Sequence, residues 1–262
     1  MEKKNLGEQA KRPIDKTINL RVWRQPRGSE EGRFVDYEVS YIDDMSFLET
    51  LDVLNEELVA KGEDPIAFDY DCREGICGSC GMVVDGVPHG PHPNMTICQV
   101  HMRHLQGMQS VAIEPWRVGA FPHVKDLVVD RSAYDKLIVE GGYTSFNVGG
   151  APDANALPIS KAVADEAFDY AACVGCGACA AACKNAAAHL FVGAKVAQLA
   201  LLPQGSPERK SRALAMVDKM DELGFGSCSN EGECEAVCPK GIKTKVIAVL
   251  NREYLRASLA RL

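Results

Sequence analysis

The sequence predicts an α+β protein in two parts, a small mixed sheet crossed by one helix and then a helical region. Three observations support this. Apolar and polar residues alternate, as in half-buried strands, over 17–26, 34–42 and 109–115. One amphipathic segment, 46–65, lies between the second and third of these stretches. From residue 165 onward alanine is frequent and β-branched residues are few, which favours helices.

The first two strands have apolar side chains at every second position. The residues expected on one face are Ile18, Leu20 and Val22 in the first strand, and Val35, Tyr37, Val39 and Tyr41 in the second. The stretches 81–87 and 109–115 are expected to add further short strands to the same sheet.

The helix between the strands has clear start and stop signals. Ser46 and Glu49 form the sequence pattern of a capping box, and Gly62 and Pro65 follow the last apolar position. The residues at helical spacing are Leu48, Leu51, Leu54, Leu58 and Val59. We therefore expect one helix with one buried face.

The division of the chain follows from these elements. The stretch 116–164, with a Gly/Pro/Asn-rich middle at 141–158, indicates connector and loop. We expect a first domain at 1–130 with its core at about 17–115, a connector at 131–164, and a helical domain at 165–262.

Composition and charge exclude several classes. The net charge is −7, which argues against nucleic-acid binding. The chain begins without an apolar leader, and its longest apolar stretch, 189–203, is broken by Lys195 and Gln198 and is too short for a bilayer span. The segment 239–262 holds six basic residues and one acidic residue, Glu253. This excess indicates a solvated helix face or a face near an anionic membrane.

Eleven cysteines are more than core packing needs, and their number is odd. Without a signal sequence the chain meets a reducing compartment, which argues against a disulfide framework. The remaining explanation is that the cysteines ligate iron–sulfur clusters or zinc.

The first cysteine group is Cys72, Cys77, Cys80 and Cys98, in which the first three have C-x4-C-x2-C spacing. The glycine-rich x4 loop is long enough to surround a flat two-iron cluster and brings backbone N–H groups close to sulfur. Zinc sites do not require such a loop. We therefore predict a [2Fe–2S] cluster in a plant-type ferredoxin (β-grasp) domain, whose fold is a mixed sheet crossed by a helix.

A cysteine ladder occurs twice in the C-terminal half. The first copy is C-x2-C-x2-C-x3-C from Cys173, and the second, from Cys228, has Glu231 in place of one cysteine. In two-cluster bacterial ferredoxins the fourth cysteine of each run ligates the other cluster. The pattern predicts two sets in a bacterial-ferredoxin-like helical domain. The second group is Cys173, Cys176, Cys179 and Cys238 around a [4Fe–4S] cluster, and the third group is Cys183, Cys228 and Cys234.

The third group has only three thiolates. A four-iron cube with one unligated corner loses that iron readily, so a [3Fe–4S] cluster is the expected occupant. The alternative is that the Glu231 carboxylate holds a fourth iron.

Four stretches together resemble one family. They are "CREGICGSC", "IEP" followed by "VKDLVVD", "CVGCGACAAAC" and "CSNEGECEAVCPKGI". The chain is similar, over roughly 17–250, to the iron–sulfur subunit of succinate dehydrogenase and fumarate reductase, the succinate:quinone oxidoreductases. The resemblance implies a subunit without catalytic residues of its own, at the cytoplasmic face of the inner membrane. Single electrons would pass between the FAD of a flavoprotein partner and quinone at an integral membrane anchor, through the three clusters in chain order.

The quinone side departs from the family pattern. Ubiquinone-using relatives commonly place proline and tryptophan after the cysteine equivalent to Cys183 and a histidine after the one equivalent to Cys228, whereas here Lys184 and Ser229 follow. These two side chains can still donate hydrogen bonds to a quinone. We expect a menaquinone-type partner in which quinone binds mainly within a haem b-containing anchor.

The histidines of the 89–92 loop do not indicate a Rieske site, because all four cysteines of the first group are present. We interpret His89 and His92 as loop residues. Two other functions fit the cysteine pattern: a zinc-stabilised interaction module, which would be colourless rather than brown, and a ferredoxin-type subunit of a non-quinone reductase, which would not purify from membranes with a flavoprotein.

Overall fold

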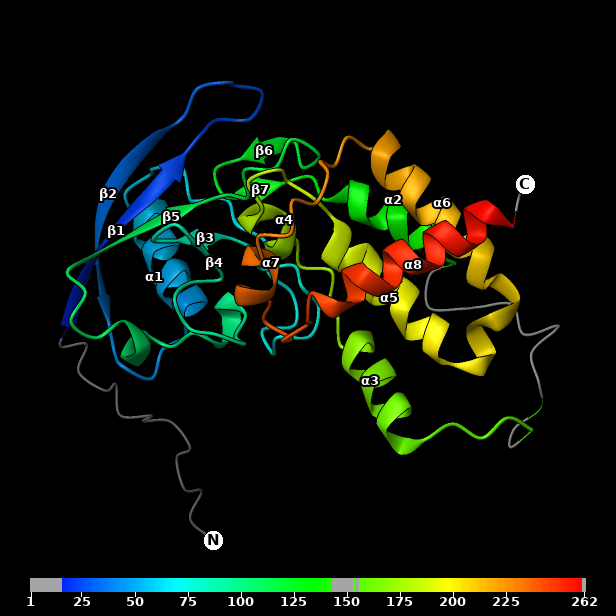
Figure 1. The fold of residues 1–262 in the computed structure, drawn as a ribbon. Coiled ribbons are helices and arrows are strands. Elements are labelled where there is room, and N and C mark those ends of the chain that lie inside the picture. The colour runs from blue at the N-terminus through cyan, green and yellow to red at the C-terminus, as the bar shows by residue number, and fades with distance from the viewer. Residues whose placement is uncertain (1–15, 143–152, 154–155, 261–262) are drawn as a thin grey trace, which may run out of the picture.

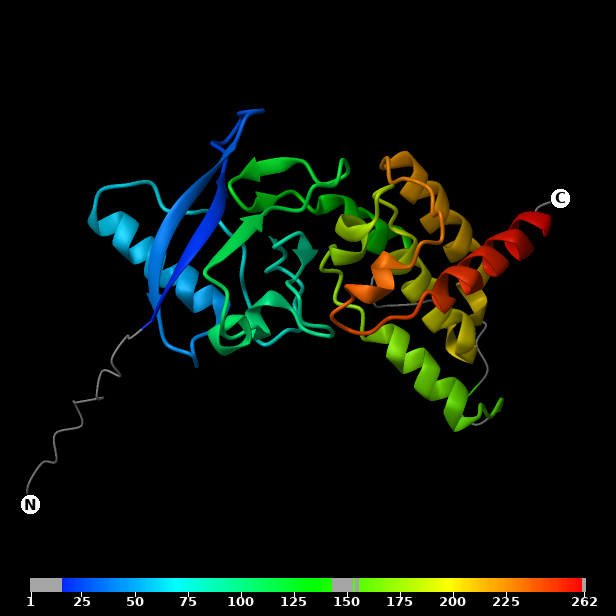
Figure 2. The same cartoon turned by 60° about the vertical axis from the view of Figure 1, so that its left-hand side comes forward.

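A computed structural model describes residues 16–142, 153 and 156–260, with strands gathered in the N-terminal half and helices in the C-terminal half (Figure 1; Figure 2). The strands are β1 Lys16–Arg24, β2 Arg33–Tyr41, β3 Val83–Val84, β4 Val87–Pro88, β5 Ser110–Glu114, β6 His123–Lys125 and β7 Val128–Val129. The α-helices are α1 Phe47–Ala60, α2 Ser132–Glu140, α3 Lys161–Ala171, α4 Ala178–Ala182, α5 His189–Leu201, α6 Arg209–Glu222, α7 Glu233–Ala236 and α8 Lys245–Leu259. The 3-10 helices are η1 Ile97–Gln99, η2 Met102–Leu105 and η3 Pro203–Glu208.

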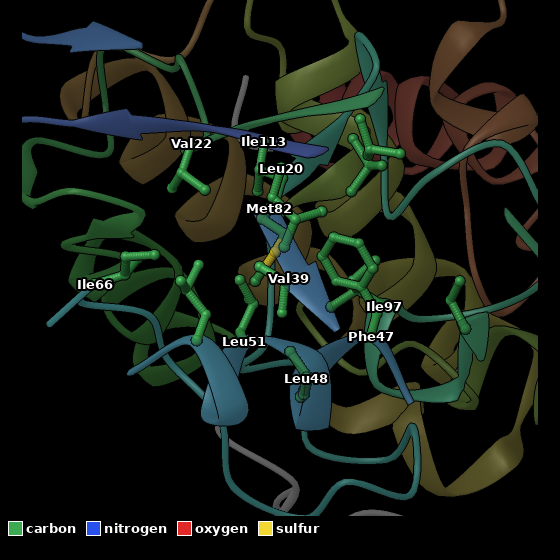
Figure 3. Close-up of a cluster of buried hydrophobic side chains, with 14 of the residues drawn as sticks. Leu20, Val22, Val39, Phe47, Leu48, Leu51, Ile66, Met82, Ile97 and Ile113 are labelled. Atoms are coloured by element: carbon green, nitrogen blue, oxygen red, sulfur yellow. The ribbon is translucent and has the colours of Figure 1, made fainter. Parts of the chain in front are cut away.

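The N-terminal sheet has the strand order β2-β1-β5-β3-β4. Strand β1 pairs antiparallel with β2 and parallel with β5, so the sheet is mixed, as the sequence predicts. Helix α1 lies across one face of it, and Leu48 and Leu51 of α1 belong to the same cluster of buried side chains as Leu20 and Val22 of β1 (Figure 3). This contact forms the first hydrophobic core.

Both hydrogen bonds of the α1 capping box are present. The Ser46 backbone N–H donates to Glu49 Oε2 over 2.6 Å, and Ser46 Oγ accepts from the Glu49 N–H over 3.2 Å. Leu54 and Leu58 are buried as expected, but Val59 is 61 % exposed. The prediction for Val59 is therefore wrong, because it lies about 100° around the helix from Leu58 and outside the buried stripe.

Two stretches differ from the sequence prediction. The stretch 81–87 contains a tight turn, since Asp85 and Gly86 both have positive φ and connect β3 to β4 as a hairpin. The stretch 116–164, predicted as connector and loop, contains the β6–β7 hairpin and α2. Burial of Leu137 and its neighbours against the helical half stabilises α2.

Helix α3 begins at Lys161, four residues before the predicted start, because the Ser160 side chain caps it. Most of the predicted loop at 141–158 lies outside the described residues.

A second hydrophobic core joins the two halves. Trp116, Phe121 and Val129 pack there with Phe191 of α5 and Met216 of α6. The segment 116–129 therefore packs against the helical half, although it precedes it in the chain. A third core lies between α3, α5 and α8.

The basic segment 239–262 is partly neutralised within the chain. Lys243 pairs with Glu235 over 3.2 Å and Lys245 with Glu166 over 2.5 Å. Arg252 and Arg256 lie beside the buried Glu253 carboxylate, while Arg261 is outside the described residues. Among the helices that the structure describes, none is both long and apolar enough to cross a membrane.

Candidate metal centres

The first cysteine group lies on the loop between α1 and β3 and on η1. Cys80 and Cys98 are buried, while Cys72 and Cys77 are half-buried. Hydrogen bonding between Cys80 and Cys98 raises the pKa of the Cys80 thiol and lowers that of Cys98 to about 6. The side chains of Cys72 and Cys77 also interact, so the structure brings the cysteines of this group together in pairs.

The backbone of this loop turns toward Cys72. The N–H groups of Glu74 and Ile76 donate to Cys72 Sγ over 3.3 and 3.4 Å. Arg73 and Gly75 have positive φ, which permits this turn. These donors stabilise a negatively charged sulfur and lower the pKa of Cys72 to about 7. The x4 loop is therefore built to hold a thiolate.

The second group surrounds one small apolar pocket. Its four cysteines line this pocket with Tyr134, Leu190, Phe191 and Ile242, so Cys238 joins a ladder that precedes it by about 60 residues. Burial raises the pKa of Cys173 to about 11 and that of Cys176 to about 12. Free thiols are thus neutral there, and a ligated metal ion would be needed to hold them as thiolates.

Helix α2 supplies an aromatic cover for the second group. Tyr134 Oη lies 3.4 Å from Cys179 Sγ, and its ring stacks on Phe191 with the ring centroids 3.9 Å apart. The backbone N–H of Ile242 is 3.4 Å from Cys238 Sγ. These groups exclude water and place hydrogen-bond donors on the sulfur atoms.

The third group lines a separate and more polar pocket. Cys183, at the end of α4, lies there with Cys228 and Cys234, alongside Lys184, Ser229 and Glu231. The structure therefore places Cys183 with the later ladder and apart from the other cysteines of its own run. The three cysteines are half-buried rather than buried.

Glu231 is held by hydrogen-bonding partners at the mouth of this pocket. Its carboxylate forms an ion pair with Lys184 and accepts a hydrogen bond from Ser229 Oγ over 3.0 Å. Asn185 Nδ2 in turn donates to Ser229 Oγ over 2.9 Å. The Lys184 ammonium lowers the pKa of Glu231, which is therefore ionised at neutral pH.

Within residues 16–142 and 156–260, no three His, Cys, Asp or Glu side chains converge closely enough for a single metal ion. The cysteines instead line pockets, and the residues around them fit a larger group. Gly177, at φ +92°, lines the second pocket, and a Cβ there would lie 3.1 Å from Phe121 and from Trp116, so glycine lets the cysteine loop pack closely against these two rings. The donor sets of four, four and three thiols match the chemistry of iron–sulfur clusters.

Sequence reasoning missed three residues around these pockets, Trp116, Arg131 and Tyr134. The Trp116 indole is buried, and its Nε1–H donates to the backbone oxygen of Cys176 over 3.0 Å. Arg131 donates to backbone oxygens of both the first and the second cysteine loops. All three lie in the segment interpreted as connector, where only the apolar spacing of α2 signals a packed element.

His89 lies in the turn after β4, as expected of a loop residue, but its side chain is buried. It is 1 % exposed, its Nδ1 accepts a hydrogen bond from the Ile97 backbone N–H, and its ring edge meets Trp116. Burial lowers its pKa to about 4, so the ring is neutral at pH 7. His92 is half-buried and contacts the His104 backbone oxygen over 3.0 Å.

Comparison with known proteins gives consistent results over both halves. The family described as "2Fe-2S iron-sulfur cluster binding domain" matches residues 19–136, and the "4Fe-4S dicluster domain" matches residues 169–242. The chain is 30% identical to the succinate dehydrogenase iron–sulfur subunit of Bacillus subtilis, over 91% of this chain and 92% of that protein. It is 28% identical to the fumarate reductase iron–sulfur subunit of Haemophilus influenzae, over 86% of this chain and 88% of that protein.

One solved structure has a similar fold. A chain of the Mycobacterium smegmatis Sdh1 complex in the apo form superposes with a TM-score of 0.65 at 23% identity, covering 92% of this chain and 95% of that one.

Proposed function

Because this chain belongs to the family of succinate dehydrogenase and fumarate reductase iron–sulfur subunits, an electron-transfer component with [2Fe–2S] and [4Fe–4S] domains, we propose that it relays single electrons between a flavin and a quinone. The observation that carries the proposal is the separation of eleven cysteines into the three groups described above, each with its own surroundings. The clusters, when bound, supply reversible one-electron oxidation and reduction.

We assign the first group to a [2Fe–2S] cluster, the second to a [4Fe–4S] cluster and the third to a [3Fe–4S] cluster. The division into a plant-type ferredoxin domain at 1–130, a connector at 131–164 and a bacterial-ferredoxin-like domain at 165–262 follows the same assignment. It is supported by the mixed sheet with α1 and by Cys183 joining Cys228 and Cys234.

The protein part of the mechanism is to hold sulfur, to orient it and to exclude water. Backbone N–H groups donate to Cys72 and stabilise negative charge there, and Tyr134 does so at Cys179. The Phe191 and Leu190 side chains keep the second pocket dry. The polar surroundings of the third pocket favour a higher reduction potential than the second pocket does, which suits an electron acceptor at the quinone end.

The occupant of the third group depends on Glu231. Its carboxylate is engaged by Lys184 and Ser229, which satisfy it without a metal ion. This supports the three-iron cluster over the alternative in which Glu231 ligates a fourth iron.

The partners follow from the family. Relatives of this chain are subunits of succinate dehydrogenase and fumarate reductase, so we propose an FAD-containing flavoprotein and an integral, haem b-containing anchor as partners. The chain would then be peripheral, on the cytoplasmic face of the inner membrane. The segment 239–262 would dock to the anchor, although its Lys243, Lys245, Arg252 and Arg256 already have partners in the chain.

Quinone contact by this chain is proposed to be minor. Lys184 and Ser229 lie at the mouth of the third pocket, but Lys184 is already paired with Glu231. We therefore propose menaquinone bound mainly within the anchor. The test is to assay the Lys184→Ala and Ser229→Ala complexes with menaquinone and ubiquinone analogues. Unchanged quinone affinity is expected, and a large loss in both variants with clusters intact would place the quinone at this junction.

The whole proposal is tested on the complex purified from membranes. We expect a brown protein that contains a flavoprotein subunit and whose visible absorption is partly bleached by succinate. A colourless zinc protein, or a brown protein that purifies without flavoprotein and does not respond to succinate, would contradict it.

A further inference from the structure

The first and second cysteine loops touch each other directly. Gly78 lies between Cys77 and Cys80, and a Cβ added there would lie 2.3 Å from the backbone oxygen of Val174. Cys77 and Cys173 also line one groove together. No other element separates the two loops at this point.

Arg131 binds both loops with one nitrogen of its guanidinium. Its Nη1 donates to the backbone oxygen of Gly78 over 2.6 Å and to those of Gly175 and Cys176 over 3.2 Å each. Arg131 immediately precedes α2, and its side chain is half-buried in the groove that Cys77 and Cys173 line. A fixed positive charge is therefore held where the two loops meet.

Trp116 completes the contact. Its Nε1–H donates to the same Cys176 oxygen, and a Cβ at Gly81 would lie 2.4 Å from Trp116 Nε1. The indole thus packs between a glycine of the first loop and the backbone of the second. Together Arg131 and Trp116 leave the two loops little freedom to separate.

Resting on the proposed function, we propose that Arg131 is the positioning residue for the one-electron step between the first and second groups. One electron leaves the first group and arrives at the second, and no bond or proton changes place. The rate of such a step falls steeply with the distance between the centres, which Arg131 fixes through its hydrogen bonds to both loops.

The charge of Arg131 acts on the same step. A thiolate-ligated cluster carries negative charge, and the arriving electron adds to it. A guanidinium half-buried where the two loops meet stabilises that added charge at either group, more strongly than a fully exposed guanidinium does. Removing the charge should therefore lower the potentials of both the first and the second group.

The test compares three variants of the full chain within its purified complex. Arg131→Met keeps most of the volume and removes the charge and the donors. Arg131→Lys keeps the charge and a donating nitrogen, but on a flexible stem without the rigid planar group that holds Nη1 in place. Arg117→Met is the matched control, because Arg117 is exposed and its guanidinium donates to the Glu114 carboxylate over 2.6 Å rather than to a cysteine loop.

Two readouts are taken after iron and sulfide are quantified. One is the magnetic interaction between the reduced clusters of the first and second groups, measured by electron paramagnetic resonance (EPR). The other is a redox titration of each cluster. Arg131→Met should retain both clusters, weaken the interaction and make both clusters harder to reduce, by on the order of tenfold in the reduction equilibrium. Arg131→Lys should restore the two potentials but not the full interaction, and Arg117→Met should resemble wild type.

Two outcomes overturn the inference. If both clusters are present and Arg131→Met changes neither the interaction nor the two potentials, Arg131 has no positioning role. If Arg131→Met fails to assemble, Arg131→Lys decides, and wild-type interaction in that variant rejects the inference. Absence of reducible clusters from wild type would instead reject the proposed function, and the inference with it.

Discussion

The second and third cysteine groups begin with ladders of nearly the same spacing but differ in their surroundings. The second group has four cysteines in an apolar pocket covered by Tyr134 and Phe191. The third has three cysteines beneath exposed polar residues, with Lys184 paired to Glu231. Burial raises the pKa of Cys176 to about 12 and, less strongly, that of Cys234 to about 11.

We infer from this difference that separate parts of the chain determine the ligand spacing and the environment of each cluster. The ladder residues decide which cysteines meet. The cover comes from α2 in one case and from the residues following Cys183 and Cys228 in the other. An apolar cover disfavours added negative charge, whereas a polar surface favours it. The following predictions test this contrast, beginning with the largest expected effect.

Removing one thiol from each group should have unequal consequences. Cys176 is buried in the core that joins the two halves, so Cys176→Ser should destabilise the fold by about 4 kcal/mol or more. Cys228→Ser should lose only the third cluster. Thermal unfolding and iron content of the two variants provide the comparison, and equal destabilisation would show that the second pocket is no more central than the third.

Restoring the missing cysteine should make the two groups alike. Glu231→Cys supplies a fourth thiolate, so we expect a [4Fe–4S] cluster in the third group and a potential lower by on the order of 100 mV. EPR of the oxidised complex should lose the three-iron signal. Glu231→Gln serves as the control and should keep it. A three-iron signal that persists in Glu231→Cys would mean that position 231 cannot reach the cluster.

The hydroxyl of Tyr134 should affect the reduction potential of the second group and not those of the other groups. Tyr134→Phe removes the hydroxyl that lies 3.4 Å from Cys179 Sγ but keeps the ring stacked on Phe191. The lost hydrogen bond should lower the potential of the second cluster by about 40 mV, because one such bond contributes about 1 kcal/mol. Tyr170→Phe is the matched control, since that hydroxyl donates to Glu166. A redox titration in which both variants shift equally would disprove a specific role for Tyr134.

The ion pair between Lys184 and Glu231 should make a small, pH-dependent contribution to the thermal stability of the protein. Lys184 lowers the folded-state pKa of Glu231, so the pair stabilises the protein above the unfolded Glu pKa. That stabilisation is lost as the pH falls through the lowered folded-state pKa. Wild type and Glu231→Gln should therefore differ in Tm by no more than about 2 °C at neutral pH and not at all in acid. A difference that grows as the pH falls would have the wrong sign.

The sequence predicts much of the fold because its signals are local. The alternation in 17–26 and the Ser46–Glu49 capping box describe β1 and α1 well, and both are confirmed. The pattern fails where packing at a distance decides the structure. Helix α2 is short, and it is stabilised by burying Leu137 against the helical half, which the local sequence signals only through the apolar spacing of the helix.

At the candidate site, the grouping of the cysteines could be predicted from the sequence, but the contacts around them could not. The cysteine spacing alone predicts that Cys183 joins Cys228 and Cys234, and the structure places them in one pocket. The contacts of Trp116 and Arg131 with the second loop could not be predicted. They are hydrogen bonds from side chains to backbone oxygens between segments 44 to 60 residues apart, and a backbone acceptor leaves no pattern in the sequence.

Glu231, which stands where the other ladder has a cysteine, is proposed to give the third group a different cluster from the second. The most direct measurement is EPR together with Mössbauer spectroscopy of the oxidised wild-type complex. We expect one three-iron cluster with a signal near the free-electron g value, alongside one four-iron and one two-iron cluster. Spectra with two four-iron clusters and no three-iron signal would contradict it, and would identify Glu231 as a ligand.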